Sequence, residues 1–375
     1  MKKFIKDVIF LVIIPYLLVW APTVPFYFMV KDTGELESIT INLKKQRENH
    51  KILIGLGYNE QTSYYKLVNA NYYQKDVIAL GTSRVMQFKH EFFNKNFYNC
   101  GGAVRGNYDE YLNFLQNLTY KPDIILLGLD AWVFNDAWNK NCLQYDKFRN
   151  IQEIDRGKGA VIYSIIKDWI LKKWEIADLD LYPDNIGFNG CVKDEGFMYD
   201  GSYYYGYIYR SPEKQKDYKF VDTLQRISKG ISRFEWAKEI DDETFVQLEN
   251  LLHYCQKSQI YVIGFLAPFA PSIYAEMVKS GNYEYITKIS PLCKTLFEKY
   301  EFEFFDYMDG AELNVTDEFF IDGFHGSEIV YGYILKDMAN KNSRISKYLN
   351  QVKIDELLEN PYSGLVFFNP DFISE

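Results

Sequence analysis

The sequence predicts an α/β protein of three layers, with helices on both faces of a parallel sheet. In two stretches, about residues 75–130 and 241–340, short apolar segments alternate with helical patterns. The segment DIILLGL at 123–129 has the unbroken hydrophobicity of a strand that is buried on both faces of a parallel sheet. This alternation of strand and helix patterns is absent from 131–240, which predicts a long insertion after the third strand.

Five strands and five helices follow from these patterns. The strands are expected at 76–80, 97–99, 123–129, 260–266 and 302–306. The helices are expected at 85–94, 107–118, 241–259 and 285–300, and from about 327 onward. Parallel sheets bind ligands at the carboxyl ends of their strands. We therefore expect the turns 81–83, 101–102 and 128–130 to meet at one edge.

The N-terminus has the pattern of a membrane anchor. Lys2, Lys3 and Lys6 precede an apolar run at 8–20 that continues to Val30. This length suffices to cross a bilayer, and the lysines favour a cytoplasmic N-terminus. A cleaved signal peptide is the alternative, but a small-x-small cleavage site is not evident. We expect a single-pass anchor in the cell membrane, with the lipid bilayer as a partner and the remainder extracytoplasmic.

The expected organisation and composition limit the other function classes. The anchor is expected at 1–30, a polar stalk at 31–74, the α/β domain at 75–345 and a C-terminal extension at 346–375.

The net charge of −9 argues against a nucleic-acid partner. The five cysteines form neither a CxxC motif nor a zinc-ligand spacing, so neither a metal nor another cofactor is predicted. Cys142 and Cys191 lie in the insertion, and the sequence allows either a disulfide between them or two buried free thiols.

Ser83 is the candidate nucleophile. It follows the first strand at the start of an expected helix, where backbone N–H groups stabilise negative charge. The same position suits a helix cap, so the distant pair Asp322 and His325 decides between the two. Histidine suits general-base work near neutral pH, and a carboxylate fixes its tautomer. His50, His90 and His253 lie in the stalk or in helices, which leaves His325 as the base.

These residues resemble the SGNH, or GDSL-like, hydrolases. That family has a serine after the first strand, a glycine after the second, an Asn in a Gly-x-Asn turn after the third, and a late Asp-x-x-His. Here GTS at 81–83, the 101–106 region and DGFH at 322–325 match in order. The resemblance covers about residues 75–135 and 255–340, and it implies a flavodoxin-like fold.

The resemblance also implies the role of each site residue. Ser83 is the nucleophile, His325 the base and Asp322 the residue that orients the base. The oxyanion hole is implied to consist of the Ser83 backbone N–H and that of Gly102 or Gly106.

The turn after the third strand departs from the family pattern, because Asp130 stands where Asn is expected. An amide donates to an oxyanion, whereas a carboxylate repels it, and losing such a donor costs about 3–4 kcal/mol. Three explanations are open: Asp130 is protonated by burial, Asn135 donates instead, or Asp130 pairs with Arg84. We favour the third, because a cation beside Ser83 needs a carboxylate partner or an anionic substrate. Arg84, Asp130 and Trp132 are accordingly expected on the substrate-binding side.

The chain also resembles membrane-anchored SGNH proteins of bacterial polysaccharide or teichoic-acid acylation systems. That resemblance implies acyl transfer to, or removal from, a cell-envelope glycan, with a membrane-bound acyltransferase as a partner. The aromatic-rich pieces at 168–174 and 197–209 either stack on sugar rings or form a core of their own. The sequence thus predicts a serine esterase or O-acyltransferase, and a non-catalytic scaffold that binds glycan or acyltransferase is the alternative. Arg84 also suggests a phosphodiesterase or phosphatase, but the sequence lacks the metal ligands or phosphate loop that such an enzyme normally needs.

Overall fold

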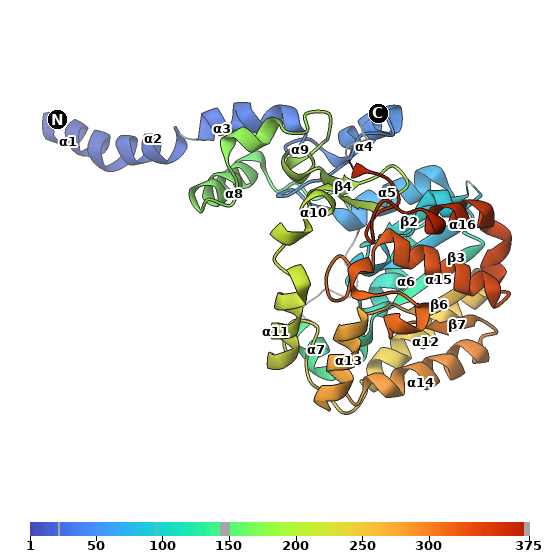
Figure 1. The fold of residues 1–375 in the computed structure, drawn as a ribbon. Helices are drawn as coiled ribbons and strands as arrows, with labels where there is room; N and C mark the ends of the chain where they lie inside the picture. The colour runs from blue at the N-terminus through green and yellow to red at the C-terminus, as the bar shows by residue number, and fades with distance from the viewer. Residues whose placement is uncertain (22, 95, 143–150, 371–375) are drawn as a thin grey trace. The chain divides into compact units, whose positions relative to one another are not determined.

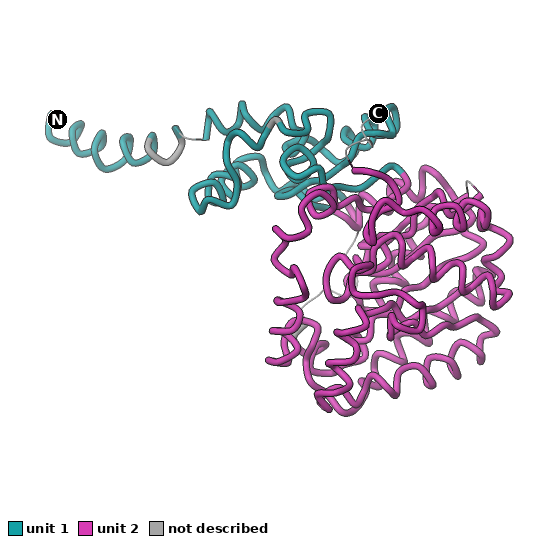
Figure 2. Tube along the Cα trace, viewed as in Figure 1, with its two compact units in different colours: residues 1–61, 153–199 teal, residues 62–152, 200–375 magenta. Residues whose placement is uncertain are grey.

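The computed structural model describes residues 1–21, 23–94, 96–142 and 151–370 (Figure 1). The chain forms two compact units, coloured separately in Figure 2. The first comprises 1–61 and 153–199, and the second, here called the sheet unit, comprises 62–152 and 200–375. The expected boundaries at 74, 131 and 240 differ from this division. Most of the expected stalk belongs with the middle of the insertion, and the rest of the insertion belongs to the sheet unit.

The sheet unit contains a five-stranded parallel sheet, which confirms the predicted α/β class. Its strands are β1 (Val77–Gly81), β2 (Phe97–Gly101), β3 (Ile124–Leu129), β6 (Tyr261–Leu266) and β7 (Glu303–Asp306). They lie in the order β2-β1-β3-β6-β7, and every neighbouring pair is parallel. Strand β2 lies on one side of β1, and the next strand along the chain, β3, lies on the other side. The carboxyl ends of β1 and β3 therefore form a switch point, where α/β sheets bind ligands.

Most of the predicted helices of the sheet unit are present. They are α6 (Tyr108–Gln116), α12 (Asp242–Lys257), α14 (Ile286–Lys299) and α15 (Glu328–Asn340). The unit also contains helices that the sequence analysis did not predict: α5 (Thr62–Tyr73), α11 (Val221–Lys229), α13 (Pro271–Ser280) and α16 (Gln351–Glu359). The Asp241 side chain accepts a hydrogen bond from the Glu243 N–H at 3.3 Å and caps α12, as its acidic start predicts. Asn107 caps α6 in the same way.

The helix expected at 85–94 is not formed. Two 3₁₀ turns, η3 (Ser83–Val85) and η4 (His90–Phe92), stand in its place. The buried Asn99 amide donates to the carbonyl oxygens of Val85 and Phe88, each at 2.9 Å. These carbonyls are acceptors that a helix would use internally. A side chain from β2 thus holds the segment after Ser83 in an irregular path.

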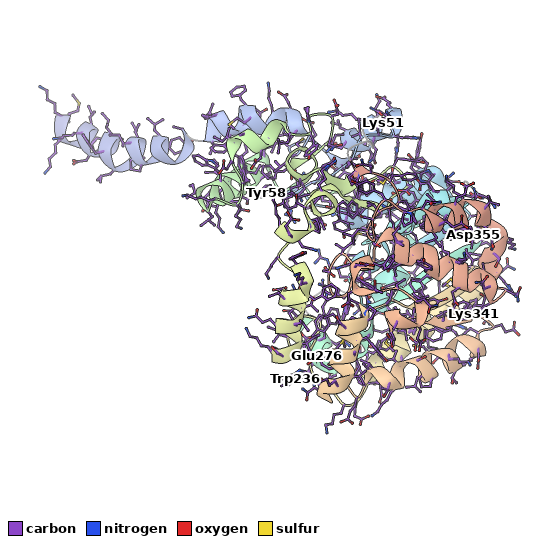
Figure 3. All side chains as sticks on the ribbon, viewed as in Figure 1. Lys51, Tyr58, Trp236, Glu276, Lys341 and Asp355 are labelled. Carbon is purple, nitrogen blue, oxygen red and sulfur yellow. The ribbon has the colours of Figure 1, made fainter. Side chains whose placement is uncertain are left out.

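Residues 346–370, predicted as a C-terminal extension, belong to the sheet unit. Helix α16 contacts α15, and Lys336 on α15 pairs with Asp355 on α16 at 2.6 Å. Asp355 is labelled in Figure 3. Farther along, the Phe367 N–H donates to the buried Glu328 carboxylate at 2.7 Å, and the Ser327 hydroxyl donates to the Gly364 carbonyl at 3.0 Å. The extension therefore fixes the first turn of α15, directly after the Asp322–His325 loop.

The first unit has a small aromatic core. Helices α3 (Thr23–Val30) and α8 (Lys158–Ile170) pack together, and α4 (Ile39–Glu48) and α9 (Phe188–Lys193) complete its main elements. The buried Trp174 ring lies 5.0 Å from the Phe188 ring and 6.2 Å from that of Phe26. Tyr58, labelled in Figure 3, donates to Asp168 at 3.2 Å. Trp174 thus belongs to a core, one of the two roles left open for the 168–174 piece.

The N-terminal segment forms α1 (Lys2–Val8), the π-helical η1 (Ile9–Ile13), α2 (Ile14–Trp20) and α3. In the part of the chain that the structure describes, none of the helices combines the length and the apolar character needed to cross a membrane. The structure therefore gives no support to the transmembrane helix expected within 1–30.

The disulfide between Cys142 and Cys191 stays a prediction. The side chain of Cys142 lies outside the described residues. The buried Cys191 thiol lies 3.3 Å from the Asn185 carbonyl oxygen, to which it donates.

Candidate active site

The turns that follow β1, β2, β3 and β6 meet at one edge of the sheet. The Thr82 hydroxyl donates to the Asp130 carboxylate at 2.7 Å, which joins the turns after β1 and β3. The Gly102 N–H donates to the carbonyl oxygen of Thr82 at 3.0 Å, which adds the turn after β2. The Arg84 guanidinium donates to the Ala267 carbonyl at 2.8 Å and reaches the end of β6. The expected meeting of the three turns is present.

The structure brings Ser83, His325 and Asp322 into hydrogen-bonding distance. Ser83 Oγ lies 2.8 Å from His325 Nε2, although 242 positions separate the two residues. His325 Nδ1 lies 2.7 Å from Asp322 Oδ2. This is the order of contacts that a Ser-His-Asp triad requires.

The surroundings of Asp322 keep it ionised. Burial by itself would raise the pKa of Asp322, but the charge and hydrogen bond of His325 and two backbone donors lower it below its ordinary value. Those donors are the N–H groups of Phe324 and His325, at 3.0 and 2.8 Å from Oδ1. A carboxylate at Nδ1 holds the proton on that nitrogen, so Nε2 is left to accept the proton of Ser83.

Residues of the insertion hold the loop that carries Asp322 and His325. The Asp217 carboxylate accepts from the Gly323 N–H at 3.1 Å, and the Gln215 amide donates to the Ile321 carbonyl at 2.7 Å. Thr223 on α11 packs so closely on Gly323 that a side chain there would collide with it. The sequence did not predict this support, because Asp217 and Gly323 lie 106 positions apart and share no motif.

Asp130 holds Arg84, as the favoured explanation predicts. The two side chains form an ion pair at 3.3 Å and are 2% and 1% exposed. Burial raises the pKa of Asp130, and the Arg84 charge and the Thr82 hydroxyl oppose that shift. The Arg84 guanidinium also faces the ring of Phe269 at 4.5 Å. Its buried position corrects the expectation that Arg84 and Asp130 contact the substrate, because both are enclosed by the protein.

Two of the expected oxyanion donors are already used. The Gly102 N–H donates to the Gly81 carbonyl at 2.9 Å as well as to that of Thr82. The Asn135 amide donates to the Glu235 carbonyl at 2.6 Å and accepts from the Ala137 N–H at 2.9 Å. Both groups have other partners, and the Asn135 side chain is fully buried, so the structure gives no support to their predicted role in the oxyanion hole.

The backbone N–H groups of Ser83 and Gly106 remain as candidate donors. Among the described residues, neither group has a hydrogen-bond acceptor. Gly106 has a φ of +127°, a conformation that side chains rarely adopt.

Trp132 lies beside the loop that carries Asp322 and His325. Its ring is 2% exposed, lies 5.9 Å from the Phe324 ring in an edge-to-face arrangement, and has the Arg84 guanidinium 5.1 Å from its centre. Its indole N–H is buried and has no hydrogen-bond partner among the described residues. The expected direct contact with substrate stays a prediction, and the ring forms part of the wall between Arg84 and Phe324.

A second polar cluster has the residue types of a metal site. One ligand atom each of His90, Glu91 and Asp200 lies within 4.8 Å of the others. Burial lowers the pKa of His90, but the hydrogen bonds and charges of Asp200 and Glu91 outweigh it and raise the pKa to about 10. The His90 backbone N–H and ring both contact the Asp200 carboxylate, at 3.0 and 3.3 Å, so the cluster fastens the segment after Ser83.

Comparisons with known proteins add no relative. The chain matches no model of a known protein family, and a search of curated proteins finds no match. Assignment of a function therefore depends on the residues and geometry described above.

Proposed function

We propose that this protein is a serine esterase or O-acyltransferase of the SGNH type that works through an acyl-enzyme on Ser83. The observation that carries the proposal is the Asp322–His325–Ser83 chain of hydrogen bonds at 2.7 and 2.8 Å. It lies at the carboxyl edge of a parallel sheet, with its members in the chain order of that family.

The chemistry follows from the positions of the protons. As Ser83 Oγ bonds to the acyl carbonyl carbon, its proton passes to His325 Nε2, and Asp322 stabilises the imidazolium. The oxygen of the tetrahedral intermediate becomes negative and is stabilised by the Ser83 and Gly106 N–H groups. The intermediate then expels the alcohol, which takes the proton from Nε2. Water or a sugar hydroxyl next attacks the acyl carbon while His325 Nε2 takes its proton. The bond from that carbon to Ser83 Oγ then breaks, and Oγ recovers the proton from Nε2.

The proposed substrate is an acyl ester of a cell-envelope polysaccharide. The resemblance to membrane-anchored members of polysaccharide acylation systems supports this substrate and a membrane-bound acyltransferase partner. The basic and apolar N-terminal sequence supports a location at the cell membrane. Hydrolysis and transfer share the triad and differ only in the acceptor that reaches the acyl-enzyme.

A non-catalytic scaffold is the second candidate, and the turn after the third strand of the chain, β3, supports it. Asp130 replaces the expected amide donor, and Asn135 and Gly102 use their hydrogen bonds elsewhere. An oxyanion hole that lacks one donor costs about 3–4 kcal/mol of transition-state stabilisation. Measurable turnover of an acetyl ester by the purified chain distinguishes the enzyme from the scaffold.

Labelling with a fluorophosphonate probe tests the proposal. We expect stoichiometric labelling of the wild-type chain, because His325 activates the Ser83 hydroxyl, and peptide mass spectrometry should place the label on Ser83. Ser83→Ala and His325→Ala should not be labelled. Ser228→Ala, which removes an exposed hydroxyl on α11, is the matched control and should be labelled like wild type. Full labelling of Ser83→Ala would rule out the proposed nucleophile.

A further inference from the structure

Arg233 places a cation beside the triad. Its guanidinium carbon lies 5.5 Å from the centre of the Trp132 ring and 5.7 Å from that of Phe324. The Phe324 ring in turn lies 4.4 Å from the His325 ring. The Arg233 side chain is exposed, whereas that of Arg84 is buried. Of these two arginines, Arg233 is therefore the one that can meet a substrate next to His325.

Neighbouring arginines already have carboxylate partners. Arg84 pairs with Asp130 inside the protein, and Arg226 pairs with Asp222 one helical turn away. Within the described ranges, the Arg233 guanidinium has neither an ion pair nor a hydrogen bond. Its contacts are the two aromatic faces, which hold a guanidinium while its N–H donors stay available.

The backbone at Arg233 is held in an uncommon conformation. Ser232 and Arg233 have φ values of +55° and +78°, where residues with a side chain are strained. The next residue, Phe234, is fully buried, and its carbonyl accepts from the Tyr283 hydroxyl at 2.8 Å. Before this turn, the Ile227 carbonyl accepts from the same hydroxyl at 3.2 Å and from the Trp236 indole at 3.0 Å.

Hydrogen bonds to the residues before and after positions 232 and 233 therefore hold this strained turn in place. Trp236, labelled in Figure 3, also packs on Gly230. Strain of this kind persists where surrounding structure over-determines it, and it concentrates at functional sites.

We propose that Arg233 binds an anionic oxygen group of the substrate beside the scissile ester, and so selects acyl esters of negatively charged glycans over neutral ones. A guanidinium stacked on aromatic rings pairs with a phosphate or carboxylate through parallel N–H donors. The whole chain carries a charge of −9 and repels such a substrate, so a local cation is needed beside His325. The proposal rests on the proposed function at Ser83 and names the class of its substrate.

Matched aryl acetates test the proposal. We compare kcat/KM for 4-acetoxybenzoate, 4-acetoxyphenyl phosphate and the neutral 4-acetoxybenzamide. Wild type should prefer the anionic esters by about tenfold, as expected for one charge-assisted contact. Arg233→Gln should remove this preference through KM, and Arg233→Lys should keep part of it. The relative rates of the first two esters show whether carboxylate or phosphate is the better ligand.

Arg344→Gln is the matched control. Arg344 is also an exposed arginine over an aromatic ring, 4.0 Å from that of Tyr261, which begins β6 and so lies at the sheet end opposite the site. This variant should keep the wild-type preference. An unchanged preference in Arg233→Gln, or equal rates of wild type on the anionic and neutral esters, would overturn the role of Arg233.

A binding measurement separates this inference from the proposed function. Calorimetry of phenyl phosphate and benzoate with Ser83→Ala should show binding that Ser83→Ala/Arg233→Gln loses by about tenfold. If Ser83→Ala hydrolyses esters at the wild-type rate, the nucleophile is wrong, and the loss of binding still supports Arg233. If binding is the same in both variants, the anion site is wrong, whatever the activity of Ser83.

Discussion

Ser83→Ala is expected to lower kcat for 4-nitrophenyl acetate by at least about 10³-fold, the effect typical of removing a triad nucleophile. His325→Ala should cost about as much, because Ser83 loses the base that lies 2.8 Å from its hydroxyl. Residues that act as a unit are not additive, so the double variant should be no slower than either single one. Steady-state kinetics on the three variants measures this.

Unfolding curves supply the control for these variants. The free energy of unfolding should change little in Ser83→Ala, since it removes one half-buried hydroxyl. Additive losses in the double variant would contradict a shared catalytic unit, and turnover retained by Ser83→Ala would contradict the nucleophile.

Asp130→Ala is expected to lower the free energy of unfolding by about 3–5 kcal/mol, because it leaves the Arg84 guanidinium buried and unpaired. It also removes the acceptor of the Thr82 hydroxyl, which positions the residue before Ser83. Urea unfolding followed by circular dichroism measures the change. Arg84→Met/Asp130→Leu should recover most of the loss, because apolar side chains of similar size replace a buried pair at little cost.

The exposed pair of Lys336 and Asp355 is the matched control for this prediction. Its nitrogen and oxygen lie 2.6 Å apart, but the side chains are 44% and 48% exposed, so solvent screens the attraction. Asp355→Ala should therefore cost less than about 1 kcal/mol. Equal effects of Asp130→Ala and Asp355→Ala would show that the buried pair does not support the turn at Ser83.

The sheet could be predicted from the sequence because each strand carries its own signal. Segments such as 123–129 are apolar without interruption, and burial on both faces demands that composition. The caps Asn107 and Asp241 likewise mark helix starts with local chemistry. The proximity of Ser83, His325 and Asp322 could be predicted because the sheet brings its turns to one edge, and because the Asp322–His325 pair has no other structural explanation.

Features that depend on tertiary contacts could not be predicted. The pattern at 85–94 favours a helix, but Asn99 on β2 takes two of its carbonyl acceptors. The oxyanion candidates Gly102 and Asn135 have suitable chemistry, yet their donors point to other carbonyls of the folded chain. Arg233 belongs to no motif, and only the turn after α11 places it over Trp132.

Trapping of the acyl-enzyme tests the central claim most directly. Wild type mixed with 4-nitrophenyl acetate and quenched in acid within milliseconds should gain one acetyl group in its intact mass, and peptide mapping should place that group on Ser83. Asp322→Asn should accumulate it more slowly, because the His325 tautomer is no longer fixed. An acetyl group on another residue, or turnover by wild type with Ser83 never acetylated, would contradict the account.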